Sequence, residues 1–340
     1  MVLTLEQLRA AAWGAVYLTQ EDGTVCFHRF SAEQEEQYRL YSEEFWKKTF
    51  ATAGVRLCFR TDSPWMDLEI QALQTMPRTY FALDVAVNDT RIGSIDNVSG
   101  LELPEDYTTI TCELGSFAKR FSLGEGVKTV TISFPWTADL RVKALKLAEG
   151  AAFSPVHRPK KLLAFGDSIT QGYDALHPDR RYVALLADAL DAEEINKAIG
   201  GEVFYPPLAE TAEEMAPDYI IVAYGTNDWS KLERPELLRH AHMFLDTLRQ
   251  KYPDAKLFVL LPIWRKDRDE YRKYGSFDLM RADLAQVAEE LELPVIDCYD
   301  FVPKDPSYFA DLRLHPNDRG FEAYAAQLAD AIARVSEEET

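Results

Sequence analysis

Two patterns of hydrophobic positions divide the chain. Between residues 54 and 147, apolar and polar residues alternate in short runs, as at Val55, Leu57 and Phe59, and turn-rich breaks separate these runs. The alternation predicts half-buried β-strands, and several such strands with little helix indicate an antiparallel sandwich. Ahead of them, residues 32–51 carry a pattern that predicts one helix.

The second half of the chain alternates short apolar runs with helical patterns. The apolar runs lie near residues 162–165, 219–224, 257–261 and 295–296. Apolar residues recur at helical spacing in three segments, at Leu237, Ala241, Phe244 and Leu248, at Phe277, Met280, Leu284, Val287 and Leu291, and at Phe321, Tyr324, Leu328 and Ile332. Alternating strands and helices predict a parallel sheet covered by helices on both faces.

A junction separates the two halves. The segment from Gly150 to Lys160 contains Pro155 and Pro159, and both residue types interrupt regular structure. We therefore predict a sandwich domain over residues 1–150, a linker over 151–160 and an α/β domain over 161–340. A chain of 340 residues is long enough for two ordinary domains.

Polar motifs follow three predicted strands of the second half. They are Gly-Asp-Ser at 166–168, Gly-Gly at 200–201 and Gly-Thr-Asn-Asp at 225–228, and a fourth motif, His-Pro-Asn-Asp at 315–318, precedes the last helix. Open parallel sheets bind ligands outside the carboxyl ends of their strands, where the strand order reverses. We therefore expect the four motifs to meet in one site.

Each motif alone is compatible with ordinary structure, because Gly, Asp, Ser and Asn are common in turns and helix caps. Together and in this order, they resemble the SGNH (GDSL-type) hydrolase superfamily. The resemblance implies an α/β fold with a flavodoxin-like, three-layer parallel sheet. The whole layout resembles two-domain bacterial carbohydrate esterases, which implies a jelly-roll-like antiparallel β-sandwich at the N-terminus.

The resemblance also implies catalytic roles. Ser168 is the nucleophile, and because a serine hydroxyl is a weak nucleophile at neutral pH, it needs a base, for which His315 is the best placed of six histidines. The backbone N–H groups of Ser168 and Gly201 and the side-chain amide of Asn227 form the oxyanion hole. Gly200 is the alternative to Gly201.

The triad acid departs from the family pattern. The family places an aspartate three residues before the histidine, where this chain has Leu312, and the nearest acid is Asp311. Asp311 can reach the imidazole Nδ1 if a bulge-like turn absorbs the extra residue. In the alternative, a backbone carbonyl orients His315 and the enzyme works as a Ser–His dyad. We favour Asp311, and assign Asp318 to the start of the last helix.

Further residues near the motifs could shape a substrate pocket. Aromatic residues at sheet ends are often only packed, so packing is the alternative for each. The pocket candidates are Asp167, Tyr173, Trp229, Trp264 and Arg265.

Composition limits the partners. A net charge of −19 disfavours nucleic acid and anionic membranes, and no run approaches the roughly 20 apolar residues of a membrane span. Residues 1–18 lack the pattern of a signal peptide, so we expect a cytoplasmic protein. Four widely spaced cysteines indicate free thiols, and we expect no metal and no cofactor.

The motifs indicate an ester hydrolase without specifying its substrate. The resemblance implies removal of a short acyl group, mainly acetyl, from a small-molecule or oligosaccharide ester. One alternative is a lysophospholipase or thioesterase for longer acyl chains, and another is a non-catalytic carbohydrate-binding protein. The sandwich could bind sugar, form a wall of the site, or serve as the contact surface of a homo-oligomer.

Overall fold

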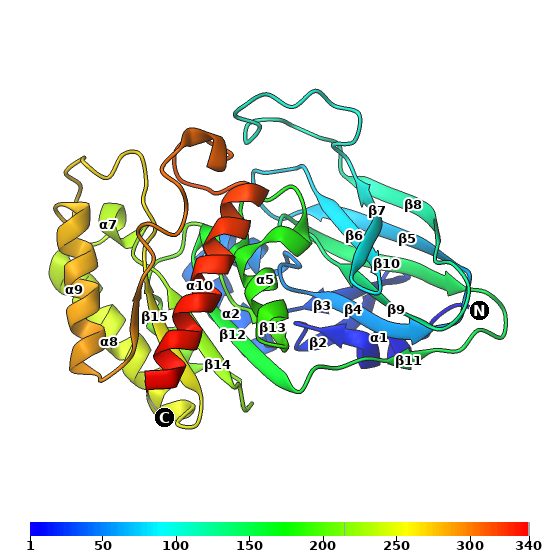
Figure 1. The fold of residues 1–340 in the computed structure, drawn as a ribbon, viewed down its shortest axis with the longest axis horizontal. Coiled ribbons are helices and arrows are strands. Elements are labelled where there is room, and N and C mark those ends of the chain that lie inside the picture. Colours follow the sequence, from blue (N-terminus) through cyan, green and yellow to red (C-terminus); the bar gives the residue numbers. More distant parts are fainter. Residues whose placement is uncertain (214, 339–340) are drawn as a thin grey trace. The chain divides into compact units, whose positions relative to one another are not determined.

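The computed structural model describes residues 1–213 and 215–338, which form two compact units (Figure 1). The sandwich unit comprises Met1–Leu103, Thr108–Pro159 and Leu176–Asp179. The α/β unit comprises Pro104–Tyr107, Lys160–Ala175 and the described residues from Arg180 onward. Each unit therefore includes one short segment that is separated in sequence from the rest of it.

The sandwich unit contains two antiparallel sheets, as the alternating pattern predicts. One sheet has the order β1-β4-β9-β6-β7, with β11 paired to β4, and the other has the order β2-β3-β10-β5-β8. The strands of the first sheet are β1 (Ala12–Trp13), β4 (Arg56–Thr61), β6 (Ala82–Val87), β7 (Thr90–Asp96), β9 (Lys128–Ser133) and β11 (Ser154–Pro155). Those of the second are β2 (Tyr17–Glu21), β3 (Thr24–His28), β5 (Trp65–Gln74), β8 (Gly115–Ser122) and β10 (Ala138–Leu147).

Alternate residues of these strands fill one hydrophobic core. In β5, every second side chain from Met66 to Ala72 is buried, and Leu57 and Phe59 of β4 belong to the same core. The confirmed feature is the pair of antiparallel sheets; the jelly-roll-like topology remains a prediction.

The single helix expected over residues 32–51 is wrong. The segment forms α2 (Ala32–Tyr41) and α3 (Glu43–Thr49), and a further short helix, α1 (Leu5–Ala11), lies near the N-terminus. Ser42 adopts an extended backbone between α2 and α3 (φ −164°, ψ 126°), and its hydroxyl accepts a hydrogen bond from the Phe45 N–H. Ser42 therefore ends one helix and caps the next, which a hydrophobic periodicity does not reveal.

The α/β unit contains a five-stranded parallel sheet, which confirms the predicted architecture. Its spatial order is β13-β12-β14-β15-β16, the flavodoxin-like order, which reverses direction at β12. The strands are β12 (Lys160–Gly166), β13 (Ala192–Asn196), β14 (Tyr219–Ala223), β15 (Lys256–Leu261) and β16 (Val295–Asp297).

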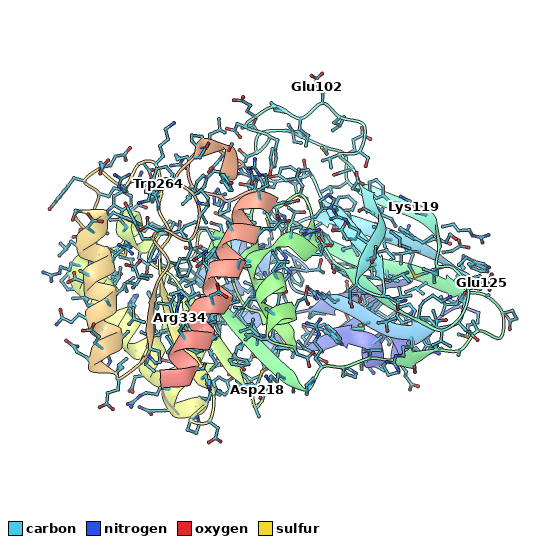
Figure 2. The ribbon with its side chains drawn as sticks, in the orientation of Figure 1. Glu102, Lys119, Glu125, Asp218, Trp264 and Arg334 are labelled. Atoms are coloured by element: carbon cyan, nitrogen blue, oxygen red, sulfur yellow. The ribbon has the colours of Figure 1, made fainter. Side chains whose placement is uncertain are left out.

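Helices cover this sheet. Tyr182 of α5 stacks on Tyr324 of α10, whereas Phe244 of α8 contacts Phe165 of β12 at a ring distance of 5.3 Å. The helices are α4 (Ser168–Gln171), α5 (Tyr182–Ala189), α6 (Pro206–Glu210), α7 (Asp228–Lys231), α8 (Arg234–Lys251), α9 (Phe277–Glu290) and α10 (Asp318–Glu338), with two 3₁₀ turns at Pro178–Arg180 and Pro306–Tyr308. Charged side chains such as Asp218 and Arg334 extend outward (Figure 2).

Across the described part of the chain, no helix combines the length and apolarity that crossing a bilayer requires.

A buried polar network fixes the turn that follows β12. Arg181 and Glu194 form a bidentate ion pair at 2.7 and 2.9 Å, with side chains 2% and 1% exposed. The Asn196 amide donates to Glu194 and to the carbonyl of Thr170 in α4. Gly172 ends α4 with a left-handed backbone (φ +103°), and a Cβ there would lie 2.0 Å from Arg181 Cδ. The network therefore ties α4 to β13 and to the start of α5.

Removing one partner of this ion pair leaves a buried charge without compensation. We expect Glu194→Ala to lower the free energy of unfolding by about 3–5 kcal/mol. Urea denaturation followed by circular dichroism measures the change. The control Glu289→Ala, at an exposed position of α9, should change stability by less than about 0.5 kcal/mol. Equal effects of the two variants would contradict a role for the ion pair.

Candidate active site

The Gly-Asp-Ser motif forms a tight turn between β12 and α4. Asp167 caps α4, and its carboxylate accepts a hydrogen bond from the Ile169 N–H at 3.0 Å. Gly166 permits the close approach of strand and helix, because a Cβ there would lie 2.3 Å from Thr170 Oγ1. Ser168 is consequently the first residue of α4, at the carboxyl end of β12.

Ser168 meets His315 directly. The Ser168 Oγ lies 2.9 Å from Nε2 of His315, a residue 147 positions later in the chain. This distance is within the range for proton transfer between a nucleophile and its base. His315 lies in the loop that leads into α10, and its side chain is 12% exposed.

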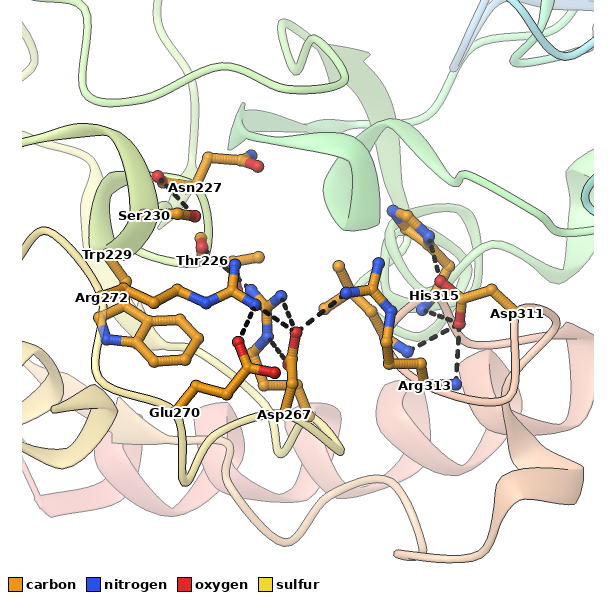
Figure 3. A network of polar contacts seen from close by, with 12 residues as sticks. Thr226, Asn227, Trp229, Ser230, Asp267, Glu270, Arg272, Asp311, Arg313 and His315 are labelled. Atoms are coloured by element: carbon orange, nitrogen blue, oxygen red, sulfur yellow. Dashed lines mark hydrogen bonds and ion pairs between the residues drawn. The ribbon is translucent and has the colours of Figure 1, made fainter.

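The other imidazole nitrogen faces Asp311. The distance from His315 Nδ1 to Asp311 Oδ2 is 2.9 Å (Figure 3). The second carboxylate oxygen, Oδ1, accepts hydrogen bonds from three successive backbone N–H groups of the same loop, those of Arg313, Leu314 and His315. Burial raises the pKa of Asp311, but the bond and charge of His315 and the backbone donors outweigh it, so the pKa lies well below its usual range.

Leu312 explains how the extra residue is accommodated. It adopts a left-handed backbone (φ +54°), which is uncommon for a residue with a branched side chain. The chain thereby turns between Asp311 and His315, and the carboxylate reaches Nδ1 from four residues away. The structure thus brings Ser168, His315 and Asp311 together in the arrangement that the sequence analysis favours.

A second carboxylate, Asp174, also faces His315 and was missed by the sequence analysis. Its Oδ2 lies 3.3 Å from His315 Nδ1, and its side chain is completely buried. Asp174 follows the turn at the end of α4 and has a left-handed backbone (φ +72°). The hydroxyl of Tyr107, another residue that was missed, donates to the backbone carbonyl of Asp174 at 2.6 Å. The one sequence signal that could have identified Asp174 was its position shortly after Gly-Asp-Ser.

The geometry distinguishes the two candidate glycines of the oxyanion hole. The Gly200 N–H already donates to the side chain of Gln171 at 2.7 Å. Gly201 has a left-handed backbone (φ +88°), and its N–H has no partner among the described residues. Its carbonyl accepts a hydrogen bond from the Lys231 ammonium group. Gly201 is therefore the better donor to an oxyanion.

Asn227 lies on the neighbouring loop after β14. Its side-chain amide donates one hydrogen bond to the Glu202 carbonyl at 3.0 Å, which orients the amide and leaves its second N–H for another acceptor. Asp228 follows, and its carboxylate accepts from the N–H groups of Phe204 and Gly225. Burial raises the pKa of Asp228 to about 7, and burial likewise raises that of Asp167 to about 6.

The pocket candidates fall into two groups. Tyr173 packs beside His315 with 5.7 Å between ring centroids, and Trp264 lies against Phe309 with 8% of its surface exposed. Trp229 is completely buried, and the guanidinium groups of Arg265 and Arg272 lie 5.1 and 4.5 Å from the centroid of its ring. The structure therefore places Trp229 and Arg265 in the packed interior, where they support the site from behind.

Asp267 connects the loops that carry the site residues (Figure 3). Its carboxylate accepts hydrogen bonds from Arg265, Arg272 and Arg313 at 2.5–3.0 Å. Arg265 also donates to the carbonyl of Thr226, the residue before Asn227. Burial raises the pKa of Asp267, but the three guanidinium groups outweigh it, so the pKa is lower than usual.

One group of side chains has the spacing of metal ligands. The ligand atoms of Asp174, Asp311 and His315 lie within 4.8 Å of one another, and this is the one such group among residues 1–213 and 215–338. The same atoms face each other around His315 Nδ1, and hydrogen bonding accounts for their arrangement without a metal.

A family model and several solved structures are similar to this chain. Residues 164–323 match the model of the GDSL-like Lipase/Acylhydrolase family. No curated protein sequence matches the chain.

Solved structures are similar over nearly the whole chain. The salicylyl-acyltransferase of a tetracycline biosynthetic pathway is 21% identical with a TM-score of 0.79, covering 96% of this chain and 94% of its own. A family two carbohydrate esterase from Cellvibrio japonicus is 17% identical with a TM-score of 0.65, covering 99% and 97%. An acetyl xylan esterase from Butyrivibrio proteoclasticus is 15% identical with a TM-score of 0.58, covering 85% and 92%. At these identities the likeness establishes the fold alone.

The hydrogen bonds of Asp311 predict a pH-dependent stability. Because the folded-state pKa is depressed, the stabilisation is present above the unfolded pKa of about 3.9 and is lost as the pH falls toward the folded-state value. We expect Asp311→Asn to lower the free energy of unfolding by roughly 1–3 kcal/mol at neutral pH, with a smaller difference below about pH 4.

Urea titrations at several pH values measure this difference. Asp300→Asn is the matched control, since the Asp300 side chain is 76% exposed, and it should have little effect at any pH. A difference between wild type and Asp311→Asn that is unchanged at about pH 3 would contradict the depressed pKa.

Proposed function

We propose that the protein is a serine esterase that removes short acyl groups, chiefly acetyl, from carbohydrate esters, because residues 164–323 match the model of the GDSL-like Lipase/Acylhydrolase family. The observation that carries the proposal is the line of polar contacts from Ser168 Oγ through His315 to Asp311, with 2.9 Å at each step. This arrangement supplies a nucleophile, a base and an orienting acid.

The proposed reaction has two steps. In the first, His315 Nε2 takes the proton of Ser168 Oγ as this oxygen attacks the ester carbonyl carbon, and the imidazolium then protonates the departing sugar oxygen. In the second, His315 deprotonates a water molecule that attacks the acyl-serine, and the imidazolium returns the proton to Ser168 Oγ as the acid is released. Asp311 accepts a hydrogen bond from the Nδ1 N–H throughout. The Nδ1 nitrogen therefore stays protonated, and Nε2 remains available as the base.

The oxyanion of each tetrahedral intermediate needs donors that are already in place. The Ser168 and Gly201 N–H groups and the second N–H of Asn227 supply them, and each such donor typically contributes about 10²–10³ in rate. The bond from Asn227 to the Glu202 carbonyl limits the reorientation required during the reaction.

Two observations support a short acyl group on a carbohydrate. The fold similarity to a family two carbohydrate esterase and to an acetyl xylan esterase covers 99% and 85% of this chain. The Tyr173 ring is also packed so closely against Gly200 that a Cβ there would lie 2.3 Å from it, and the same ring contacts His315. We propose that this ring limits the space for the acyl chain.

Acyl transfer to an acceptor other than water is the second candidate function. It is favoured by the fold similarity to the salicylyl-acyltransferase, which has a TM-score of 0.79. The same nucleophile would form the acyl-enzyme in both cases, and only the acceptor of the second step would differ.

A panel of p-nitrophenyl acetate, butyrate and octanoate tests the proposed function. We expect the acetate ester to be preferred and Ser168→Ala to lower kcat by roughly 10⁴-fold or more. Preference for octanoate would favour a lipase or thioesterase, and activity that survives in Ser168→Ala would contradict the proposed nucleophile. Formation of an acylated product with added alcohols, at the expense of free acetate, would favour acyl transfer.

Acetylated xylo-oligosaccharides test the carbohydrate part. We expect Ser168-dependent release of acetate, measured by chromatography, with no requirement for a metal ion. Pre-incubation with EDTA should therefore leave the rate unchanged. A rate abolished by EDTA and restored by a divalent ion would contradict the mechanism.

A further inference from the structure

We propose that Asp174 is a second positioning carboxylate, which shares the Nδ1 proton of His315 with Asp311. The inference rests on the proposed function, because it assigns a role in the catalytic cycle of the same histidine. It adds an acid that lies on the nucleophile's own turn, more than a hundred residues away from Asp311 in sequence.

The contact geometry supports a shared proton. His315 Nδ1 has one carboxylate oxygen of Asp311 at 2.9 Å and one of Asp174 at 3.3 Å. A ring N–H has a single hydrogen, so two acceptors at these distances divide one donor between them. The Asp174 side chain is completely buried, which places its charge in a medium where the attraction to an imidazolium is stronger than in water.

The backbone holds Asp174 in place at an energetic cost. A left-handed conformation (φ +72°) is strained for a residue other than glycine, although aspartate tolerates it better than most. The hydroxyl of Tyr107 donates to the Asp174 carbonyl, and the preceding Tyr173 packs on the His315 ring. These contacts fix the side chain toward Nδ1.

The two acids hold the imidazole from different sides. Asp311 accepts hydrogen bonds from three backbone N–H groups of its own loop, so it orients His315 relative to that loop. Asp174 lies six residues after Ser168 on the turn that carries the nucleophile. A carboxylate on that turn therefore orients the imidazole relative to Ser168 itself, and it stabilises the positive charge that forms when His315 accepts the serine proton.

The charge surroundings of His315 determine the expected pH effect. The nucleophile turn contributes Asp167, Asp174 and Tyr173, and the histidine loop contributes Asp311 and Arg313. Tyr107 interacts electrostatically with both acids and with Asp318. Carboxylates predominate in this group, and their negative charges favour the imidazolium form of His315. Removing a carboxylate that contacts Nδ1 therefore disfavours that form.

The variant Asp174→Asn tests the proposal, because asparagine keeps the size and tolerates the left-handed backbone. We expect kcat for p-nitrophenyl acetate to fall roughly tenfold with little change in KM. We also expect the acidic limb of the kcat/KM profile to move to lower pH by roughly one unit. Asp174→Gly, which suits the same backbone, should give the same displacement if the asparagine variant folds poorly.

Two further variants make the result specific. Asp300→Asn removes a carboxylate whose side chain is 76% exposed and should leave the acidic limb of the profile almost in place. Asp311→Asn combined with Asp174→Asn should displace the limb further than either single variant. An unmoved limb in folded Asp174→Asn and Asp174→Gly, with the Nδ1 proton resonance unchanged by NMR, would overturn the proposal.

The proposed function and this inference fail in different ways. If Ser168→Ala retains full activity, the proposed nucleophile is wrong. If Ser168→Ala is inactive while both Asp174 variants keep the wild-type rate and pH profile, the esterase mechanism stands and the role of Asp174 is wrong.

Discussion

The contact between Ser168 Oγ and His315 Nε2 is the interaction on which the account of this protein depends. It joins two loops that lie 147 residues apart in sequence, and proton transfer requires it to stay near 2.9 Å. A hydrogen bond alone cannot hold two loops in this register. The surrounding structure must therefore also hold the serine and the histidine in place.

The serine is fixed by the sheet and by buried polar contacts. Reversal of strand order at β12 puts the end of that strand between the ends of β13 and β14, where Gly201 and Asn227 follow. The Asn196 amide then donates to the Thr170 carbonyl of α4, beside the ion pair of Arg181 and Glu194. The histidine is fixed by Asp311 within its loop, and Asp267 joins that loop to the one before Asn227 through its arginine partners.

Features that follow from local sequence could be predicted, and features that depend on distant contacts could not. Apolar runs and their spacing predicted the parallel sheet and the antiparallel sheets. The motifs identified Ser168 and His315, whose side chains meet, and placed Gly201 and Asn227 on loops that follow neighbouring strands. The break at Ser42 was missed, because a cap is a backbone event that leaves the apolar pattern intact.

Asp174 and Asp267 were missed for another reason. Asp267 has no sequence signal, and the signal for Asp174 was only its place shortly after Gly-Asp-Ser. The folded loops show which of 56 acidic residues faces a histidine or several arginines. The position of Trp229 beside a motif suggested a substrate pocket. In the structure its ring is buried and packs against the guanidinium groups of two arginines.

The most direct measurement of the central claim is covalent labelling of the intact protein with a fluorophosphonate, a reagent that reacts with serine hydroxyls activated by a neighbouring base. Mass spectrometry of the whole chain and of its peptides then gives the number and the position of the adducts. The account predicts one adduct, on Ser168, that forms rapidly in wild type and is lost in His315→Ala. An unlabelled protein, or an adduct on another residue at the same rate in both proteins, would contradict it.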